Sequence, residues 1–255
     1  MIFYVILFFI IGSAIGSFLN VVIDRTTHGE SIMGRSYCDY CRVTLGTLDL
    51  IPIFSFVGLG AKCRHCKKPI SWQYPAVEAV CGLLFVFSFL SLSQFGNLST
   101  LNLILDFFLV SVLIVVAVID LKFSLIPTTF VLFASLVFLV FNYFALMPAI
   151  FVDHVMAAFG ASIFFAVIVF VTRGRGMGEG DIFLAFLIGM VLGLAGTVLA
   201  LFLAFFSGAV VSLLLIAMRK KRFGQTVPFG PFLVFGLILA FFWSKPIIDW
   251  YLGTL

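Results

Sequence analysis

Charged residues are scarce in this sequence. Only 10% of its 255 residues are Asp, Glu, Lys or Arg, whereas 63% are hydrophobic and 34 are phenylalanine. A soluble domain of this length has roughly a quarter charged residues. In water such a chain would expose far too much apolar surface, so the composition predicts a protein that crosses a lipid bilayer several times.

Stretches without any formal charge locate the expected membrane spans. A spanning helix needs about 20 mostly apolar residues. The charge-free stretch 182–218 is too long for one such helix, and Gly193, Gly196 and Thr197 offer a turn inside it. We therefore predict an all-α polytopic protein with about eight transmembrane helices, at residues 2–22, 74–94, 101–120, 126–146, 154–172, 181–195, 198–218 and 228–245.

The basic residues predict the orientation of these helices. If the N-terminus lies outside, every Lys and Arg except Lys245 falls in an inner loop. The positive-inside rule then places both termini outside and the basic loops in the cytoplasm. The formal net charge of +4 indicates membrane lipids as partners and no nucleic acid, because the cations border an anionic leaflet. The first helix lacks a basic n-region and a cleavage site, which predicts a retained helix rather than a signal peptide.

The pattern divides the chain into three parts. Residues 1–23 are the first transmembrane helix, residues 24–73 form a polar cytoplasmic insert, and residues 74–255 form a seven-helix membrane core. The insert is too small to build a secure hydrophobic core by itself. We therefore expect a second source of stability within it.

Four cysteines in the insert predict a metal site. They form two CxxC pairs with 21 residues between them, and the members are Cys38, Cys41, Cys63 and Cys66. Two such knuckles suit one tetrahedral zinc, and four thiolates leave no open position, so the predicted role is structural. Two disulfides or a redox CxxC are the alternatives. A cytoplasmic location disfavours structural disulfides, and no βαβ pattern surrounds either pair.

Two aspartates lie at the predicted cytoplasmic border of the membrane. Asp120 ends one expected helix, and Asp181 begins another after the glycine-rich stretch 174–180. Two carboxyl groups in one site share a proton, so one can activate water while the other polarises a carbonyl. Gly178 and Gly180 lack side chains and would let an extended substrate backbone approach closely.

The two aspartates also fit a structural role or a role in transport. Each carboxylate could cap a helix or pair with Lys122, Arg173 or Arg175. Intramembrane acids also serve proton-coupled transport. A transporter, or a membrane scaffold whose zinc insert binds a partner, is therefore the alternative function. A transporter predicts acids spread along a path, whereas here they gather at one border.

Several short motifs, in order, resemble a known family. They are residues 16–22 (GSFLNVV), 34–36 (GRS), 49–52 (DLIP), 70–71 (IS), Tyr74-Pro75, Glu78, Asp120 with Ile126-Pro127, and 178–181 (GEGD). Together with the four cysteines, this series is similar to the bacterial prepilin peptidases, which are type IV leader peptidases of the GxGD aspartyl protease class. The similarity covers nearly the whole chain.

The resemblance implies an activity and a location. Members of this family sit in the bacterial inner membrane and cut a basic leader from type IV prepilins or pseudopilins on the cytoplasmic side. The catalytic pair carries over to Asp120 and Asp181. Members with a four-cysteine insert commonly also methylate the new N-terminal amine with S-adenosylmethionine. Asp49 and Glu78 fall within the similarity and are candidates for positioning the basic leader or that amine, with a salt-bridge role as the alternative.

Overall fold

The computed structural model describes residues 1–94, 96, 98–174, 176–219 and 227–253. These residues form helices and two isolated β-bridges, with no strand among them. Six of the described helices are long and apolar enough to cross a membrane, and a shorter apolar helix spans Gly230–Ser244. The predicted all-α membrane fold is therefore confirmed. The cations Arg175, Lys220, Lys221 and Arg222, and the side chain of Lys245, which the predicted orientation uses, lie outside the described residues.

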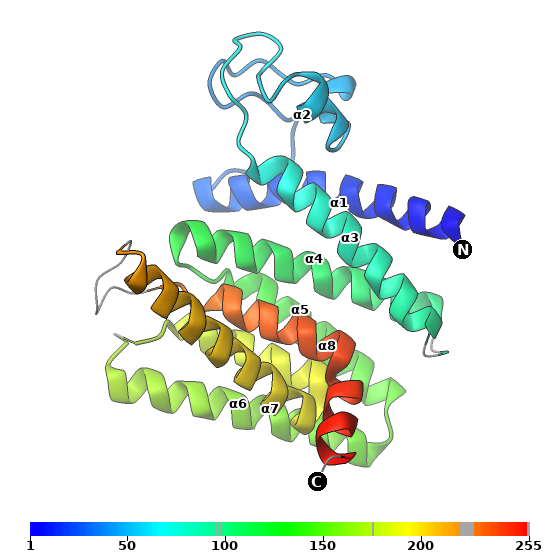
Figure 1. The fold of residues 1–255 in the computed structure, drawn as a ribbon, viewed down its shortest axis with the longest axis vertical. Coiled ribbons are helices and arrows are strands. Elements are labelled where there is room, and N and C mark those ends of the chain that lie inside the picture. The colour runs from blue at the N-terminus through cyan, green and yellow to red at the C-terminus, as the bar shows by residue number, and fades with distance from the viewer. Residues whose placement is uncertain (95, 97, 175, 220–226, 254–255) are drawn as a thin grey trace. The chain divides into compact units, whose positions relative to one another are not determined.

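The chain divides into two compact units, residues Met1–Val115 and Val116–Leu255. The first unit contains α1 (Ile2–His28), η1 (Thr47–Leu50), α2 (Phe54–Gly58), α3 (Gln73–Gln94) and most of α4 (Thr100–Phe123). The second contains the end of α4, then α5 (Thr128–Ala145), α6 (Pro148–Thr172), α7 (Glu179–Ala217) and α8 (Gly230–Gly253). Figure 1 shows these elements in order of sequence.

In the first unit, α1 and α3 pack closely because glycine lines their interface. A Cβ at Gly12 would come within 2.8 Å of the Cys81 carbonyl, and one at Gly82 within 2.7 Å of Ser13 Oγ. The same approach continues at Gly16, against the backbone of Glu78. Near the end of this helix pair, Asn20 donates a hydrogen bond to the Tyr74 carbonyl at 3.1 Å. This packing fixes the start of α3, which carries Glu78 and directly follows the insert.

In the second unit, α6, α7 and α8 lie side by side (Figure 1). Gly189 of α7 packs directly on the backbone of Ala158 in α6, and Gly236 of α8 packs on the Ala200 carbonyl of α7. Small residues allow this approach, which supplies packing energy where a lipid environment supplies no hydrophobic drive between helices. The bundle holds the two ends that carry Asp120 and Asp181.

The α7 segment consists of two helical arms joined by a kink at Gly193. Its 39 residues would span about 58 Å at 1.5 Å each, about twice a bilayer core. Gly193 has φ 66° and ψ −175°, which are not helical angles. The two helices expected at 181–195 and 198–218 are therefore present as two helical arms that meet at the kink at Gly193.

Candidate active site and metal centre

The two cysteine pairs form matching turns in the insert. In the first, Cys38 N–H bonds the Val43 carbonyl at 3.0 Å and the Cys38 carbonyl accepts from Arg42 at 2.8 Å. In the second, Cys63 N–H bonds the Lys68 carbonyl at 2.9 Å and its carbonyl accepts from Lys67 at 3.1 Å. Arg42 and Lys67 both have positive φ, at 56° and 60°. Each turn therefore presents two thiols on the same side of a tight loop.

The four sulfurs meet in one cluster. Cys38, Cys41, Cys63 and Cys66 have their Sγ atoms all within 4.8 Å of one another, and all four are free thiols. Cys38 Sγ and Cys66 Sγ are 3.9 Å apart. Tetrahedral zinc with bonds of about 2.3 Å separates its sulfurs by about 3.8 Å, whereas a disulfide needs about 2.05 Å. The donor set and its geometry therefore fit a structural zinc ion.

The electrostatics of the cluster also favour a bound cation. Backbone N–H groups of Cys66 and His65 point at Cys63 and lower the pKa of its thiol to about 6. At Cys66 the Lys68 backbone acts in the same direction, but burial and the neighbouring thiols prevail and raise the pKa to about 11. Thiols this close cannot all ionise alone, and a divalent cation relieves that repulsion.

Asp120 lies in the last turn of α4 and is 4% exposed. The helix ends three residues later, where Ser124 adopts φ 53° and donates to the Asp120 carbonyl at 2.8 Å. Gly230, the first residue of α8, lies against the carboxylate: a Cβ there would come within 2.6 Å of Asp120 Oδ2. Glycine at this position therefore leaves room for the Asp120 side chain.

Asp181 lies in the first turn of α7 and is also 4% exposed. Its Oδ2 accepts a hydrogen bond from the Gly178 backbone N–H at 3.0 Å, which satisfies one donor at the start of the helix. Its Oδ1 is buried, and no described residue supplies that oxygen with a hydrogen-bond partner. One oxygen therefore caps the helix while the other stays available.

Ile126 lies close to a glycine beside each of the two carboxyl groups. A Cβ at Gly180 would come within 2.6 Å of Ile126 Cβ, and one at Gly230 within 3.3 Å of Ile126 Cδ1. Gly230 lies against Asp120 and Gly180 directly precedes Asp181, so these contacts with Ile126 bring the two carboxyl groups into one region. Asp120 Oδ2, like Asp181 Oδ1, is buried with no hydrogen-bond partner among the described residues. Buried oxygens without partners suit a bound water or substrate carbonyl.

Asp49 and Glu78 lie in the first unit and hold the insert together. Asp49 Oδ1 accepts from Arg64 Nε at 2.8 Å and its Oδ2 accepts from the Gly46 N–H at 3.2 Å. The Arg64 hydrogen bond lowers the pKa of the Asp49 carboxyl group. Glu78 is 7% exposed, and its Oε2 accepts from the Ile53 N–H at 2.7 Å.

Two residues of these sites, Gly230 and Arg25, were not singled out as site residues from the sequence, and Ile126 was named only as part of the motif that follows Asp120. Gly230 and Ile126 shape the space around the aspartates, and buried Arg25 donates to the carbonyls of the loop that follows α1. In retrospect Arg25 does give a sequence signal, because it is a charged residue that lies within α1, beyond the end of the charge-free stretch. Ile126 falls within the motif that follows Asp120, whereas an isolated glycine such as Gly230 gives none.

The fold and these sites define a class: a polytopic α-helical membrane protein with a four-cysteine cluster and two buried, neighbouring carboxyl groups at helix ends. The family model described as the bacterial peptidase A24 N-terminal domain matches residues 10–92, and that of the type IV leader peptidase family matches residues 107–213. The chain belongs to the type IV leader peptidase family.

Relatives of known name agree with this assignment. The chain is 36% identical to a prepilin leader peptidase/N-methyltransferase of Bacillus subtilis, over 96% of each chain. It is 32% identical to the protein of that name from Aeromonas salmonicida, over 99% of this chain and 95% of the relative. The Myxococcus xanthus protein of that name is 34% identical over 84% of this chain and 63% of its own length. No solved structure matches the chain.

Proposed function

We propose that this chain is an aspartyl endopeptidase that removes the leader of type IV prepilins or pseudopilins at the cytoplasmic border of the bacterial inner membrane. The observation that carries the proposal is the pair formed by Asp120 and Asp181. Each carboxyl group is buried beside a glycine and keeps one oxygen without a described partner. The family and the names of the relatives supply the substrate class.

The proposed reaction uses water as the nucleophile. The ionised carboxylate of the pair takes a proton from water as the oxygen attacks the scissile carbonyl carbon, and the protonated partner donates to the carbonyl oxygen. Collapse of the tetrahedral intermediate breaks the C–N bond: the carboxyl group that took the proton from water gives it to the leaving amine, and its partner recovers a proton from the former carbonyl oxygen. Which aspartate begins as the acid is a property of the pair rather than of either residue.

Gly178 and Gly180 are proposed to receive the extended substrate backbone. A helical segment hides its carbonyls, so the junction must unwind to be cut. The lack of a side chain at Gly180 also serves the fold, because it lets the Gly180 backbone pack closely against Ile126. Gly178 is exposed, which leaves its backbone accessible to a substrate.

Asparagine substitutions test the pair directly. Purified protein in detergent is given a synthetic prepilin with a basic leader and a glycine–phenylalanine junction, and product mass is followed. We expect Asp120→Asn and Asp181→Asn each to lower the cleavage rate roughly 10²- to 10⁴-fold, the range for a lost general acid or base. Cleavage at the wild-type rate by both variants would exclude the aspartyl mechanism. If the wild-type protein cuts no prepilin, the transporter or scaffold alternative replaces it.

The second proposed activity is methylation of the new N-terminal amine. It rests on the N-methyltransferase names of the relatives and on the four-cysteine insert, which methylating members of the family commonly carry. S-adenosylmethionine would supply the methyl group. In the same assay, product formed with this donor should gain the mass of one methyl group. A product of unchanged mass would show a peptidase without methylation.

A further inference from the structure

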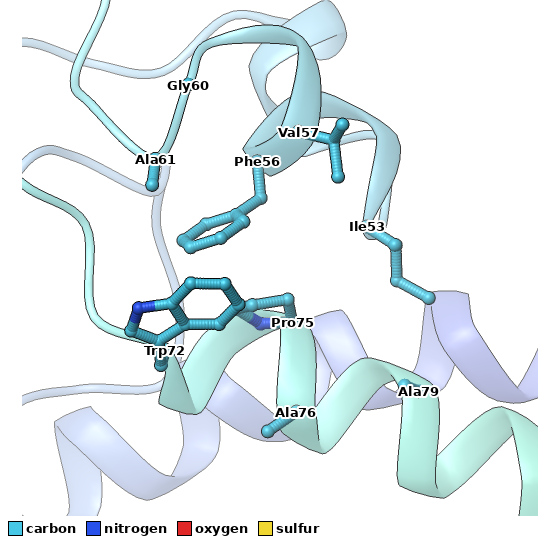
Figure 2. Close-up of a pocket in the computed structure, with 9 residues that line it drawn as sticks. All are labelled: Ile53, Phe56, Val57, Gly60, Ala61, Trp72, Pro75, Ala76 and Ala79. Atoms are coloured by element: carbon cyan, nitrogen blue, oxygen red, sulfur yellow. The ribbon is translucent and has the colours of Figure 1, made fainter.

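An apolar groove lies in the first unit, between the short helix α2 and the first turns of α3 (Figure 2). Its volume is about 500 Å³, within the range of ligand pockets. Phe56 and Trp72 pack edge to face, with ring centroids 4.9 Å apart, and together form part of its wall. Ala76 and Ala79 line the side formed by α3. The groove is distinct from both the cysteine cluster and the two aspartates.

The groove is continuous with the membrane-facing surface of α3. Ala76 and Ala79 line it, and the exposed residues Val80 and Leu83 follow along the same helix at spacings of three to four residues. These spacings place all four on one helix face. Because α3 is apolar and long enough to span a membrane, that face meets lipid, so the groove opens where lipid chains are present. Trp72, at the start of the helix, is 75% exposed, as expected of tryptophan at a membrane interface.

One residue that lines the groove has an unfavourable backbone conformation. Ile53, whose side chain lines it, has φ 63°, which is unfavourable for a β-branched residue. The buried Glu78 carboxylate accepts the Ile53 N–H at 2.7 Å and fixes this conformation. Strain retained at a cavity wall points to a use for the cavity.

The chemistry of the walls selects the occupant. The lining side chains are apolar apart from the indole N–H of Trp72, so an extended peptide would leave its backbone groups unpaired there. One turn of a helix satisfies its own backbone and, at about 420 Å³ with side chains, would also fit, so a helical segment is the competing occupant. An unbranched hydrocarbon chain has no polar group to satisfy, and the bilayer beside α3 supplies such chains. Ala61 lines the groove and is followed directly by the exposed Lys62, so a cation stands next to the lining along the chain and favours an anionic head group.

We propose that this groove binds one acyl chain of an anionic membrane phospholipid, with its head group at Lys62. The site then anchors the insert to the membrane beside the start of α3. Because this inference concerns lipid and not catalysis, it stands or falls independently of the proposed peptidase.

Trp72 is a built-in reporter for the test. The sequence has 3 tryptophans, so the full-length protein carrying Trp243→Phe and Trp250→Phe retains Trp72 alone. This protein is titrated in detergent with phospholipids that carry brominated acyl chains, which quench tryptophan on contact. We expect saturable quenching at a small lipid fraction, with phosphatidylglycerol roughly fivefold more potent than phosphatidylcholine because of Lys62.

Variants of the groove and its rim give the matched controls. Ala79→Leu, or Ala76→Leu one turn earlier, fills the groove and should raise the half-quenching lipid concentration roughly tenfold by displacing about two methylene groups. Val80→Leu, on the same helix but outside the lining, should leave it unchanged. Lys62→Gln should abolish the preference for the anionic lipid, and Lys67→Gln, at the tip of the neighbouring turn, should keep it. Far-UV circular dichroism and zinc content confirm the fold of each variant.

Three outcomes would overturn the proposal. Quenching that rises in proportion to lipid and is equal in all variants would show that Trp72 touches bulk lipid only. Equal potency of the two phospholipids would show that the site does not recognise an anionic head group. If brominated lipid has no effect and an apolar helical peptide shifts Trp72 emission instead, the occupant is a protein segment.

Discussion

The two carboxylate oxygens of Asp181 have different surroundings. Its Oδ2 caps α7 through the Gly178 N–H, while its buried Oδ1 has no partner among the described residues. A buried oxygen without a partner costs about 1–3 kcal/mol, so its presence in a folded protein points to a use for that atom. Asp120 Oδ2, in the last turn of α4, is likewise buried with no partner among the described residues. Capping and catalysis, treated as alternatives for this residue, are therefore compatible.

Gly230→Ala tests whether the space beside Asp120 matters. The added Cβ would come within 2.6 Å of Asp120 Oδ2, so the carboxyl group must move. Displacement of a reacting group by about 1 Å costs about 100-fold in rate, and we expect prepilin cleavage to fall on that scale. Gly160→Ala in α6 is the matched control, because a Cβ there meets nothing within 4 Å. Equal cleavage rates for the two variants would contradict the proposed role of Asp120.

Asp49 and Arg64 allow the salt-bridge role to be separated from a role in leader binding. If Asp49 serves only the pair, Asp49→Asn and Arg64→Gln should each lower stability by about 0.2–1 kcal/mol, since Arg64 is half exposed, and neither should change KM. If Asp49 also receives the basic leader, Asp49→Asn alone should raise KM. Kinetics and thermal unfolding of both variants decide between these roles.

The same pair predicts a dependence of stability on acid. Folding lowers the pKa of Asp49 from its usual 3.8, with the Arg64 hydrogen bond as the main cause. The contribution is therefore fully present above pH 3.8 and is lost as the pH falls through the lowered value. Unfolding of the wild type and Asp49→Asn between pH 7 and pH 2 should show their stability difference shrinking only below about pH 4. A difference that is already lost near neutral pH would point to another group.

The bend in α7 shows how side chains replace a broken helical hydrogen bond. In a regular helix the Leu194 N–H would bond the Met190 carbonyl. Here Asp153 Oδ2 accepts from Leu194 N at 3.0 Å, and Asn142 Nδ2 donates to the Met190 carbonyl at 2.7 Å, with His154 Nδ1 at 2.9 Å from the same oxygen. In lipid, backbone groups freed by a kink must find such partners.

Gly193→Ala should destabilise this bend. The backbone angles at Gly193 belong to a region that is essentially restricted to glycine, and a Cβ would come within 2.6 Å of Asp153 Oδ2. We expect a loss of about 1–3 kcal/mol in thermal or denaturant unfolding. The Gly160→Ala protein should be at least as stable as the wild type, because alanine favours a helix more than glycine does and the added Cβ meets no neighbouring atom. A stable Gly193→Ala protein would mean that α7 straightens at little cost.

Element boundaries were predicted well where charge and glycine mark them and poorly where side chains override those signals. The break near Gly193 follows from a span too long for one helix. By contrast, α1 continues to His28, past the expected end at residue 22, because buried Arg25 finds three carbonyls in the following loop. Likewise α8 continues through Pro246 to Gly253. Pairings between distant residues, such as Gly230 with Asp120, have no local sequence signal.

At the scale of the whole molecule, the lipid bilayer determined which structural features could be predicted from the sequence. A bilayer admits only helices and closed β-barrels as spanning elements because every backbone group must be satisfied internally, and charge-free stretches of about 20 residues select helices. The paired CxxC motifs likewise bring their ligands together through local turns, which makes a metal cluster predictable without knowledge of the whole fold. The apolar groove was not predicted, since it depends on the strained Ile53 and on how α2 lies over α3.

Removal of zinc should therefore affect one part of the molecule and spare the rest. The insert has few buried apolar residues, Phe56 and Cys63 among them, whereas the second unit has a long buried core. We expect about one zinc per chain in the purified protein and about none after Cys63→Ala. Cys81→Ala, which removes a buried thiol of α3 outside the cluster, should retain the metal.

In Cys63→Ala or after chelation, trypsin should rapidly cut at exposed insert residues such as Arg64 and Lys67, while far-UV circular dichroism keeps most of its helical signal. If the insert resists trypsin equally with and without metal, the cluster does not stabilise it, and its order must come from packing and from contacts such as Glu78 with the Ile53 N–H.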